Sequence, residues 1–239
     1  MPALDAAATI GRVVLGLADL GLPVIVVDDG SSDATGDEAR AAGAEVVRHE
    51  RNRGKGAAIR SGLAEAERRG AKCAVTVDAD GQHPAAAARA VLEGSSDPRA
   101  LVLGVRDLVA AGAPRSNQFG NGVSNFFLSL FARRTLRDTQ CGLRRYPVRE
   151  TLALGARADG FAFEAEVVLR AIAAGLPVVE VAVSVVYPSR EERRTHFHNV
   201  RDPASIVGTV VRTVLELRTG RAGSARSPES APEHPRSAP

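Results

Sequence analysis

The sequence predicts an α/β protein with a mainly parallel sheet, and two observations carry this prediction. Short apolar strands alternate with helical segments, an order that places helices on both faces of a parallel sheet. Acidic turn-forming segments directly follow two strands: DDGSSD (28–33) follows the strand at 24–27, and DADGQH (78–83) follows the strand at 74–77. The carboxyl ends of parallel strands share one edge of a sheet, where α/β proteins bind ligands. We therefore expect both acidic segments at one such edge.

The remaining elements follow in order along the chain. Apolar residues from Ile10 to Leu20 show helical spacing, and only Met1 precedes Pro2, so the first strand of the sheet is expected to be missing. The Gly-containing loop 52–56 is expected to open a helix that runs to Arg69. The other expected elements are helix 34–42, strand 45–47, a helix after Pro84, strand 100–105, helix 115–133, helix 164–174, strand 178–186 and helix 204–217.

Composition limits the class of protein. With 239 residues and 44% apolar side chains, the chain can fold as one domain over 1–218. The segment 219–239 is rich in Gly, Ser, Pro and Arg and is expected to be disordered. No window approaches a membrane span of roughly 20 apolar residues, and two cysteines indicate a reducing cytoplasm. Scarce aromatic residues argue against nucleic-acid binding.

The pair Asp78 and Asp80 indicates chemistry rather than folding alone. Ionised carboxylates at the end of a buried strand are costly unless a cation compensates them. Mg²⁺ is usually held by one or two carboxylates together with substrate phosphates. A solvated turn accounts for one acidic cluster as well as a metal site does, but it accounts less well for two.

Six motifs, in the same order, give the chain a family resemblance. It resembles the family 2 glycosyltransferases of GT-A fold, and most closely the branch of polyprenyl-phosphate sugar transferases related to dolichol-phosphate mannose synthase. The resemblance runs from Pro2 to about Leu217. The motifs are DDGSSD (28–33), NRGKGAAIRSGL (52–63), DADGQH (78–83), DTQCGLRRY (138–146), GFAFEAEVVLRA (160–171) and RRTHFHNVRD (193–202).

The resemblance implies a donor side that binds a nucleotide-diphosphate sugar. Asp28 and Asp29 would hold the base and ribose, and Pro2 and Asp78 would also contact the nucleotide. Mg²⁺ or Mn²⁺ would be held near the diphosphate. The implied metal ligands are Asp78, Asp80 and Gln82.

The resemblance also implies an acceptor side. Arg115 would face an acceptor phosphate, and a terminal loop would close over the phosphates. Glu164 matches an acid that begins the late helix. The acceptor side would be lined by Asp138, Gln140 and Arg144, the terminal loop would supply Arg194, His196 and Arg201, and the catalytic residues would be Asp80, Asp138 and Arg115.

The implied reaction is metal-dependent, inverting sugar transfer to a polyprenyl phosphate, by a protein peripheral to the cytoplasmic face of the cell membrane. A phosphate acceptor with a second pKa of about 6 is largely ionised at neutral pH and needs no strong base. A hydroxyl acceptor would need one, and Asp138 is the candidate. Both acceptors remain open.

Two other functions are weighed against this one. Asp5 and Ala6 stand where the family usually carries Asn-Glu, which motivates a relative that binds a nucleotide or a partner without catalysis. The intact Asp78, Asp80 and Gln82 argue against this alternative. A sugar-1-phosphate nucleotidyltransferase would instead carry a Gly-rich basic loop after the first strand, and the sequence shows none.

Several residues near the motifs are expected to be ordinary. We interpret Lys55 as part of a simple helix N-terminus, His83 as a solvated loop residue, and Cys141 as a small packed side chain. The apolar residues of 205–217 can form an interfacial helix, but a helix packed on the sheet is the favoured interpretation.

Overall fold

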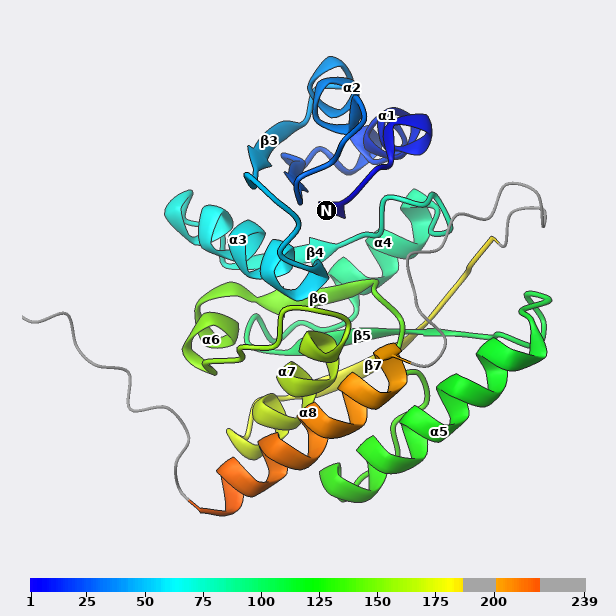
Figure 1. Ribbon diagram of the computed structural model, residues 1–239, viewed down its shortest axis with the longest axis vertical. Helices are drawn as coiled ribbons and strands as arrows, with labels where there is room; N and C mark the ends of the chain where they lie inside the picture. Colours follow the sequence, from blue (N-terminus) through cyan, green and yellow to red (C-terminus); the bar gives the residue numbers. More distant parts are fainter. Residues whose placement is uncertain (187–200, 220–239) are drawn as a thin grey trace, which may run out of the picture.

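The computed structural model describes residues 1–186 and 201–219, with side chains from 206 onward in the second range. The predicted tail lies outside these residues from 220 onward. In Figure 1, α1, α2, β2 and β3 occupy one end of the molecule, and α5 and α8 occupy the other. No helix in the described ranges is both long enough and apolar enough to cross a bilayer.

The elements alternate as the sequence predicts, with two strands, β1 and β6, and one short helix, α6, that it did not predict. In chain order they are β1 (Pro2–Ala3), α1 (Ala7–Gly16), the 3₁₀ turn η1 (Ala18–Leu20), β2 (Ile25–Asp28), α2 (Thr35–Ala41), β3 (Glu45–Arg48), α3 (Lys55–Arg68), β4 (Cys73–Thr76), α4 (Ala85–Glu93), β5 (Leu101–Arg106), α5 (Arg115–Ala132), β6 (Arg144–Pro147), α6 (Val148–Ala153), α7 (Ala162–Ala173), β7 (Val178–Val183) and α8 (Arg201–Arg218).

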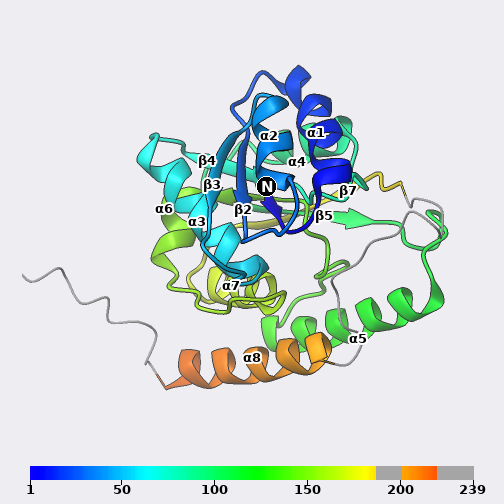
Figure 2. The same cartoon turned by 45° about the horizontal axis from the view of Figure 1, so that its top comes forward.

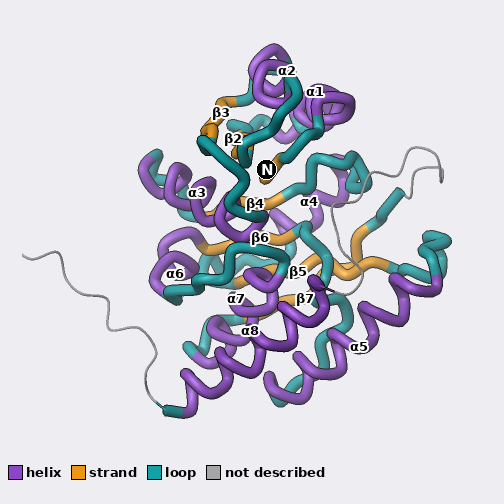
Figure 3. The backbone as a smooth tube through the Cα atoms, in the orientation of Figure 1, coloured by secondary structure: helices purple, strands orange, loops and turns teal. Residues whose placement is uncertain are grey.

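The strands form two sheets, shown in orange in Figure 3. In the first, β1, β2 and β3 are parallel, in that order. In the second, the order is β4-β6-β5-β7, and β5 and β7 are parallel. The strand β6 runs antiparallel to both β4 and β5. It and α6 were not predicted, because the segment Arg144-Arg145-Tyr146-Pro147 lacks the apolar alternation of a strand although all four residues are buried.

The prediction of a missing first strand was wrong. Pro2 and Ala3 pair with Val27 and Asp28 of β2, and the backbone N–H of Asp29 donates to the carbonyl of Ala3 at 2.8 Å. The Met1 amino group donates to the carbonyl of Ile25 at 2.8 Å. Burial lowers the pKa of this amino group to about 5, although the charge of Asp78 opposes the shift. Two residues are too few to show a periodic pattern, so only tertiary pairing reveals this strand.

Helices cover both faces of the second sheet. In β5, Leu101 and Leu103 belong to the core cluster beneath α3, α7 and α8, while Val102 belongs to the cluster beneath α1 and α4. This is the alternation expected of a strand buried on both faces. The helix α8 adds Ile206 and Val210 to the first cluster. In Figure 2, α5 and α8 lie together along the lower edge of the molecule, as an outer layer.

Candidate active site

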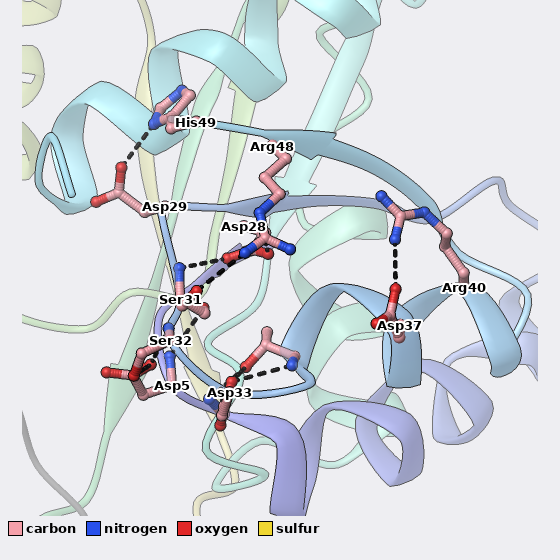
Figure 4. A network of polar contacts seen from close by, with 12 residues as sticks. Asp5, Asp28, Asp29, Ser31, Ser32, Asp33, Asp37, Arg40, Arg48 and His49 are labelled. Carbon is pink, nitrogen blue, oxygen red and sulfur yellow. Dashed lines mark hydrogen bonds and ion pairs between the residues drawn. The ribbon is translucent and has the colours of Figure 1, made fainter. Parts of the chain in front are cut away.

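The first acidic loop follows β2, and its carboxylates are held by the protein itself (Figure 4). Asp28 is completely buried, and one of its oxygens accepts a hydrogen bond from the N–H of Ser31 at 2.9 Å. The Nε of Arg48 lies 3.6 Å from the other carboxylate oxygen. This second oxygen is buried and accepts no hydrogen bond, and Gly36 packs so close to it that a Cβ there would lie 2.9 Å away.

Asp29 is held even more completely. Its carboxylate accepts hydrogen bonds from the backbone N–H groups of Arg53 at 3.0 Å and Gly54 at 2.7 Å. The Nδ1 of His49 lies 2.6 Å from the same carboxylate, and the Nε2 of His49 lies 2.9 Å from the Oγ of Ser61. Asp29 therefore fixes the loop that leads into α3.

The positions where the family usually carries Asn-Glu also serve this loop. Asp5 adopts a φ of 46°, which is rare for a residue other than glycine. Its carboxylate accepts from the backbone N–H and the hydroxyl of Ser32, at 2.8 and 3.0 Å. The N–H of Ala6 donates to the Oγ1 of Thr35 at 2.7 Å. The end of β1 is thus tied to the loop after β2.

The second acidic loop, after β4, is built differently. The Nζ of Lys55, at the first turn of α3, lies 2.9 Å from Asp78 and 3.3 Å from Glu164 of α7. It also lies 5.5 Å from the centre of the Phe161 ring. The interpretation of Lys55 as an ordinary helix N-terminus was wrong, because its side chain is largely buried between two carboxylates from other elements.

The charges of Asp78 and Lys55 shift each other's pKa. Burial alone would raise the pKa of Asp78, but the Lys55 ammonium outweighs it, and the pKa is lowered. Burial would likewise lower the pKa of Lys55, but Asp78 and Glu164 outweigh it, and the pKa is raised. Both groups are therefore ionised at neutral pH.

Gly142 allows this cluster to form. A Cβ at this position would overlap a carboxylate oxygen of Asp78 and would lie 2.8 Å from the Nζ of Lys55. The carbonyl of Gly142 accepts from the Oγ1 of Thr76 at 2.7 Å, which ties the loop to β4. Only glycine lets the backbone approach so closely.

Asp80 and Gln82 lie beyond Asp78, and Asp80 is the more accessible of the two carboxylates. The carboxylate of Asp80 accepts from the backbone N–H of Gln82 at 2.9 Å. Partial burial, followed by the negative charge of Asp78, raises the pKa of Asp80. This is the behaviour expected of a carboxylate that lies next to another negative charge.

The donor set fits a small divalent cation. Two carboxylates and an amide oxygen are hard ligands of the kind that Mg²⁺ and Mn²⁺ prefer. The described residues contain no cluster of three or more His, Cys, Asp or Glu side chains that would form an all-protein metal cage. A site with so few protein ligands suits a metal that shares its coordination sphere with substrate phosphates.

Arg106, at the end of β5, belongs to the site, and the sequence did not indicate it. Its Nε donates to Asp138 at 2.7 Å and its Nη2 donates to the other oxygen at 3.0 Å. The charge of Arg106 acts on Asp78 and Asp80, where it favours the ionised carboxylates. A charged residue that ends an apolar strand was the available signal.

The other predicted acceptor residues are more scattered. Arg144 is completely buried, and its guanidinium donates to the carbonyls of Cys141, Thr139 and Glu164. Arg115 is exposed at the first residue of α5, and Gln140 is half-buried. Outside the described residues lie Arg194, His196 and the side chain of Arg201.

Two further expectations concern the loop residues beside the site. His83 was expected to be solvated, and this was wrong: only 6% of it is exposed, because it packs 4.0 Å from the sulfur of Cys141. The prediction that Cys141 is a packed side chain is confirmed. Cys141 is completely buried, and burial raises the pKa of its thiol to about 12.

The sequence profile of Glycosyl transferase family 2 matches residues 1–145, more than half of the chain. The chain belongs to this family. It is therefore a glycosyltransferase, as the six motifs implied.

Relatives with named activities extend the similarity. A dolichyl-phosphate hexose transferase of Haloferax volcanii is 30% identical over 215 residues, which cover 88% of this chain and 87% of the relative. A polyprenol monophosphomannose synthase of Mycolicibacterium smegmatis is 32% identical over 178 residues, which cover 67% of this chain and 65% of the relative. These names support the polyprenyl-phosphate branch to which the motifs pointed.

Solved structures share the fold. Glucosyl-3-phosphoglycerate synthase from Mycobacterium tuberculosis, in complex with phosphoglyceric acid, superposes with a TM-score of 0.69 at 20% identity, over 89% of this chain and 78% of that chain. Mannosyl-3-phosphoglycerate synthase from Rubrobacter xylanophilus gives a TM-score of 0.68 at 21% identity, over 96% and 76%. The GT-A fold is thereby confirmed.

Proposed function

We propose that this glycosyltransferase moves a sugar from a nucleotide-diphosphate sugar to a polyprenyl-phosphate-type lipid at the cytoplasmic face of the membrane. The observation that carries the proposal is the combination of Asp78 and Asp80 with two largely buried cations, Lys55 and Arg106. The names of the relatives supply the acceptor class. Solved neighbours with Mn²⁺ and a uridine-diphosphate sugar support the donor class and the metal.

On the donor side, Asp80 and Gln82 would hold Mg²⁺ or Mn²⁺ together with Asp78. Such a cation stabilises the negative charge that develops on a leaving nucleoside diphosphate. The contribution of Lys55 is to neutralise Asp78, so that the loop does not present two uncompensated charges to the diphosphate. Pro2, Asp28 and Asp29 form the nucleotide side, where both acids shape the loop that receives the base and ribose.

On the acceptor side, Arg106 would bind a phosphate, and Asp138 would position Arg106. Both carboxylate oxygens of Asp138 accept from this guanidinium, and only 1% of Asp138 is exposed. A carboxylate held in this way is poorly placed to take a proton from a hydroxyl. This favours an acceptor that is already ionised, as a phosphate monoester is. Arg115, Arg194, His196 and Arg201 are further candidates for phosphate contacts.

The direct test uses the full chain with uridine- and guanosine-diphosphate sugars. A short-chain polyprenyl phosphate and the matching polyprenol are offered as acceptors, with Mg²⁺, with Mn²⁺ or with EDTA. We expect transfer to the phosphate only, and only with metal. Transfer to the alcohol would contradict the acceptor assignment, activity in EDTA would contradict the metal, and donor binding without transfer would favour a non-catalytic protein.

A further inference from the structure

An apolar surface covers the outer side of α5 and α8. On α5 the exposed residues repeat at helical spacing, with Phe119 at 76% exposure and Phe126 at 65%. On α8 they lie four residues apart. We call this surface the α5–α8 face, and its exposed members are Phe119, Val123, Phe126, Phe127, Leu130, Val207, Val211 and Leu215. A contiguous apolar surface of this kind marks an interaction site.

The fold explains why this face is left over. The opposite side of α8 packs on α7 through Ile206 and Val210, so the prediction of a packed helix describes only one of its two sides. The opposite side of α5 buries Leu128 and Ala132 in the same core. Figures 1 and 2 both show the two helices together at the edge of the molecule, where no other described element lies outside them.

A groove runs between the two helices and reaches Gln140, in the loop that follows Asp138. It encloses about 110 Å³ and is lined by apolar side chains of both helices, including Phe127 and Val211. Ser124 and Gln140 also line it. The Oγ of Ser124 lies 3.0 Å from the Oγ1 of Thr139, in the loop whose Asp138 holds Arg106. The groove thus ends beside the loop that carries Asp138, at Ser124 and Gln140.

The charges around the face are basic. The helix α5 contains no Asp or Glu, Arg115 begins it, and Arg133 and Arg134 follow its end. On α8, Arg212 is exposed and lies 4.0 Å from Glu216, which is also paired with Arg170 at 2.5 Å. A two-fold contact between copies would set this face against itself and would bring Arg115, Arg133 and Arg134 together, with no carboxylate on α5 to pair them. An anionic lipid surface would pair with them.

We propose that the α5–α8 face is the membrane-docking surface of this enzyme, with both helices lying on an anionic bilayer. The acceptor lipid chain enters the groove, and its phosphate reaches Arg106. This inference rests on the proposed lipid-phosphate acceptor. Apolar side chains, aromatic rings and a basic border are the features of helices that lie in a membrane interface.

Vesicle flotation of the full chain tests the proposal. The vesicles contain phosphatidylcholine alone or phosphatidylcholine with phosphatidylglycerol. The double variant F119S/F126S removes two exposed rings, and L15S/L22S is the matched control, because Leu15 and Leu22 are exposed near α1 at the other end of the molecule. We expect binding to the anionic vesicles that falls at least about tenfold in F119S/F126S and stays unchanged in L15S/L22S.

Activity on a water-soluble, short-chain prenyl phosphate separates docking from catalysis. F119S/F126S should keep this activity, while its activity on a long-chain acceptor in vesicles should fall. Absence of wild-type vesicle binding, or equal losses in both double variants, would overturn the proposal. A wild-type dimer that F119S/F126S converts to monomer in light scattering would also overturn it, because a second copy would then cover the face. Vesicle binding as expected, without transfer to any acceptor, would support the docking surface and reject the proposed function.

Discussion

The two acidic loops look alike in sequence but differ in what their carboxylates do. After β2, Asp28 and Asp29 are buried and accept hydrogen bonds from backbone N–H groups and a histidine. After β4, Asp78 is partly exposed and faces a lysine, and Asp80 is exposed with a raised pKa. The carboxylates of the first loop are bonded within the protein, except that Oδ2 of Asp28 accepts no hydrogen bond and lies 3.6 Å from the Nε of Arg48. The second loop keeps charge that a ligand can compensate. Two acidic motifs that look alike in sequence therefore differ in role: the carboxylates of the first mainly stabilise the loop, and those of the second are placed to bind a ligand.

The largest effect expected from this comparison is at Asp80. Asp80→Asn removes a metal-binding charge without a change of volume, and transfer should fall about 1,000-fold. The melting temperature should stay near that of the wild type, because Asp80 is exposed. Steady-state kinetics with Mg²⁺ and with Mn²⁺ measure the effect, and Asp37→Asn, on the exposed surface of α2, is the control. Near-normal turnover in Asp80→Asn would remove the distinction between the loops.

The next effect is at Lys55. Lys55→Met keeps the length of the side chain but leaves Asp78 and Glu164 facing each other without a cation. Removing one partner of such a buried cluster should cost about 3 kcal/mol of unfolding free energy. Chemical denaturation measures it, with Lys72→Met, an exposed lysine, as the control. An unchanged unfolding free energy would mean that the cluster contributes nothing to the fold.

A smaller loss of stability is expected at Asp29, without a loss of catalytic rate. Asp29→Asn weakens the charge-assisted hydrogen bonds to His49 and to the loop before α3, so the unfolding free energy should fall by about 2 kcal/mol. The rate of transfer at saturating donor should remain close to the wild-type value. If Asp29→Asn instead abolished transfer while leaving stability unchanged, the first loop would also take a direct part in the reaction.

The smallest effect is expected at Asp5. Asp5→Ala loses two hydrogen bonds to Ser32 and leaves an alanine at positive φ, which should cost about 1 kcal/mol. Asp5→Asn keeps an acceptor and tolerates that conformation, so its melting curve should lie closer to that of the wild type. Equal losses of unfolding free energy in both variants would show that the charge of Asp5, rather than its backbone geometry, stabilises the loop.

Local patterns were enough to predict much of the fold. The helices at 55–68 and 115–132 and the strands at 25–28 and 101–106 were found almost at their observed bounds, because each has its own periodicity and its own turn residues. The strand β6 was not predicted, because its arginines are buried through hydrogen bonds to carbonyl groups of other segments. The strand β1 was not predicted, because two residues are too few to form a periodic pattern.

The sequence by itself determined that acids follow two strands, that Gln82 stands two residues beyond Asp80, and that six motifs of one family lie in order. These are local facts, set by neighbours along the chain. Only the tertiary structure decided that Lys55 and Glu164 meet at Asp78, and that Arg106 is held by Asp138. It also decided that Asp29 is held by His49 and by the loop before α3. Segments far apart along the chain supply each of these partners. Long-range charge pairing sets the difference between the loops, and no local pattern records it.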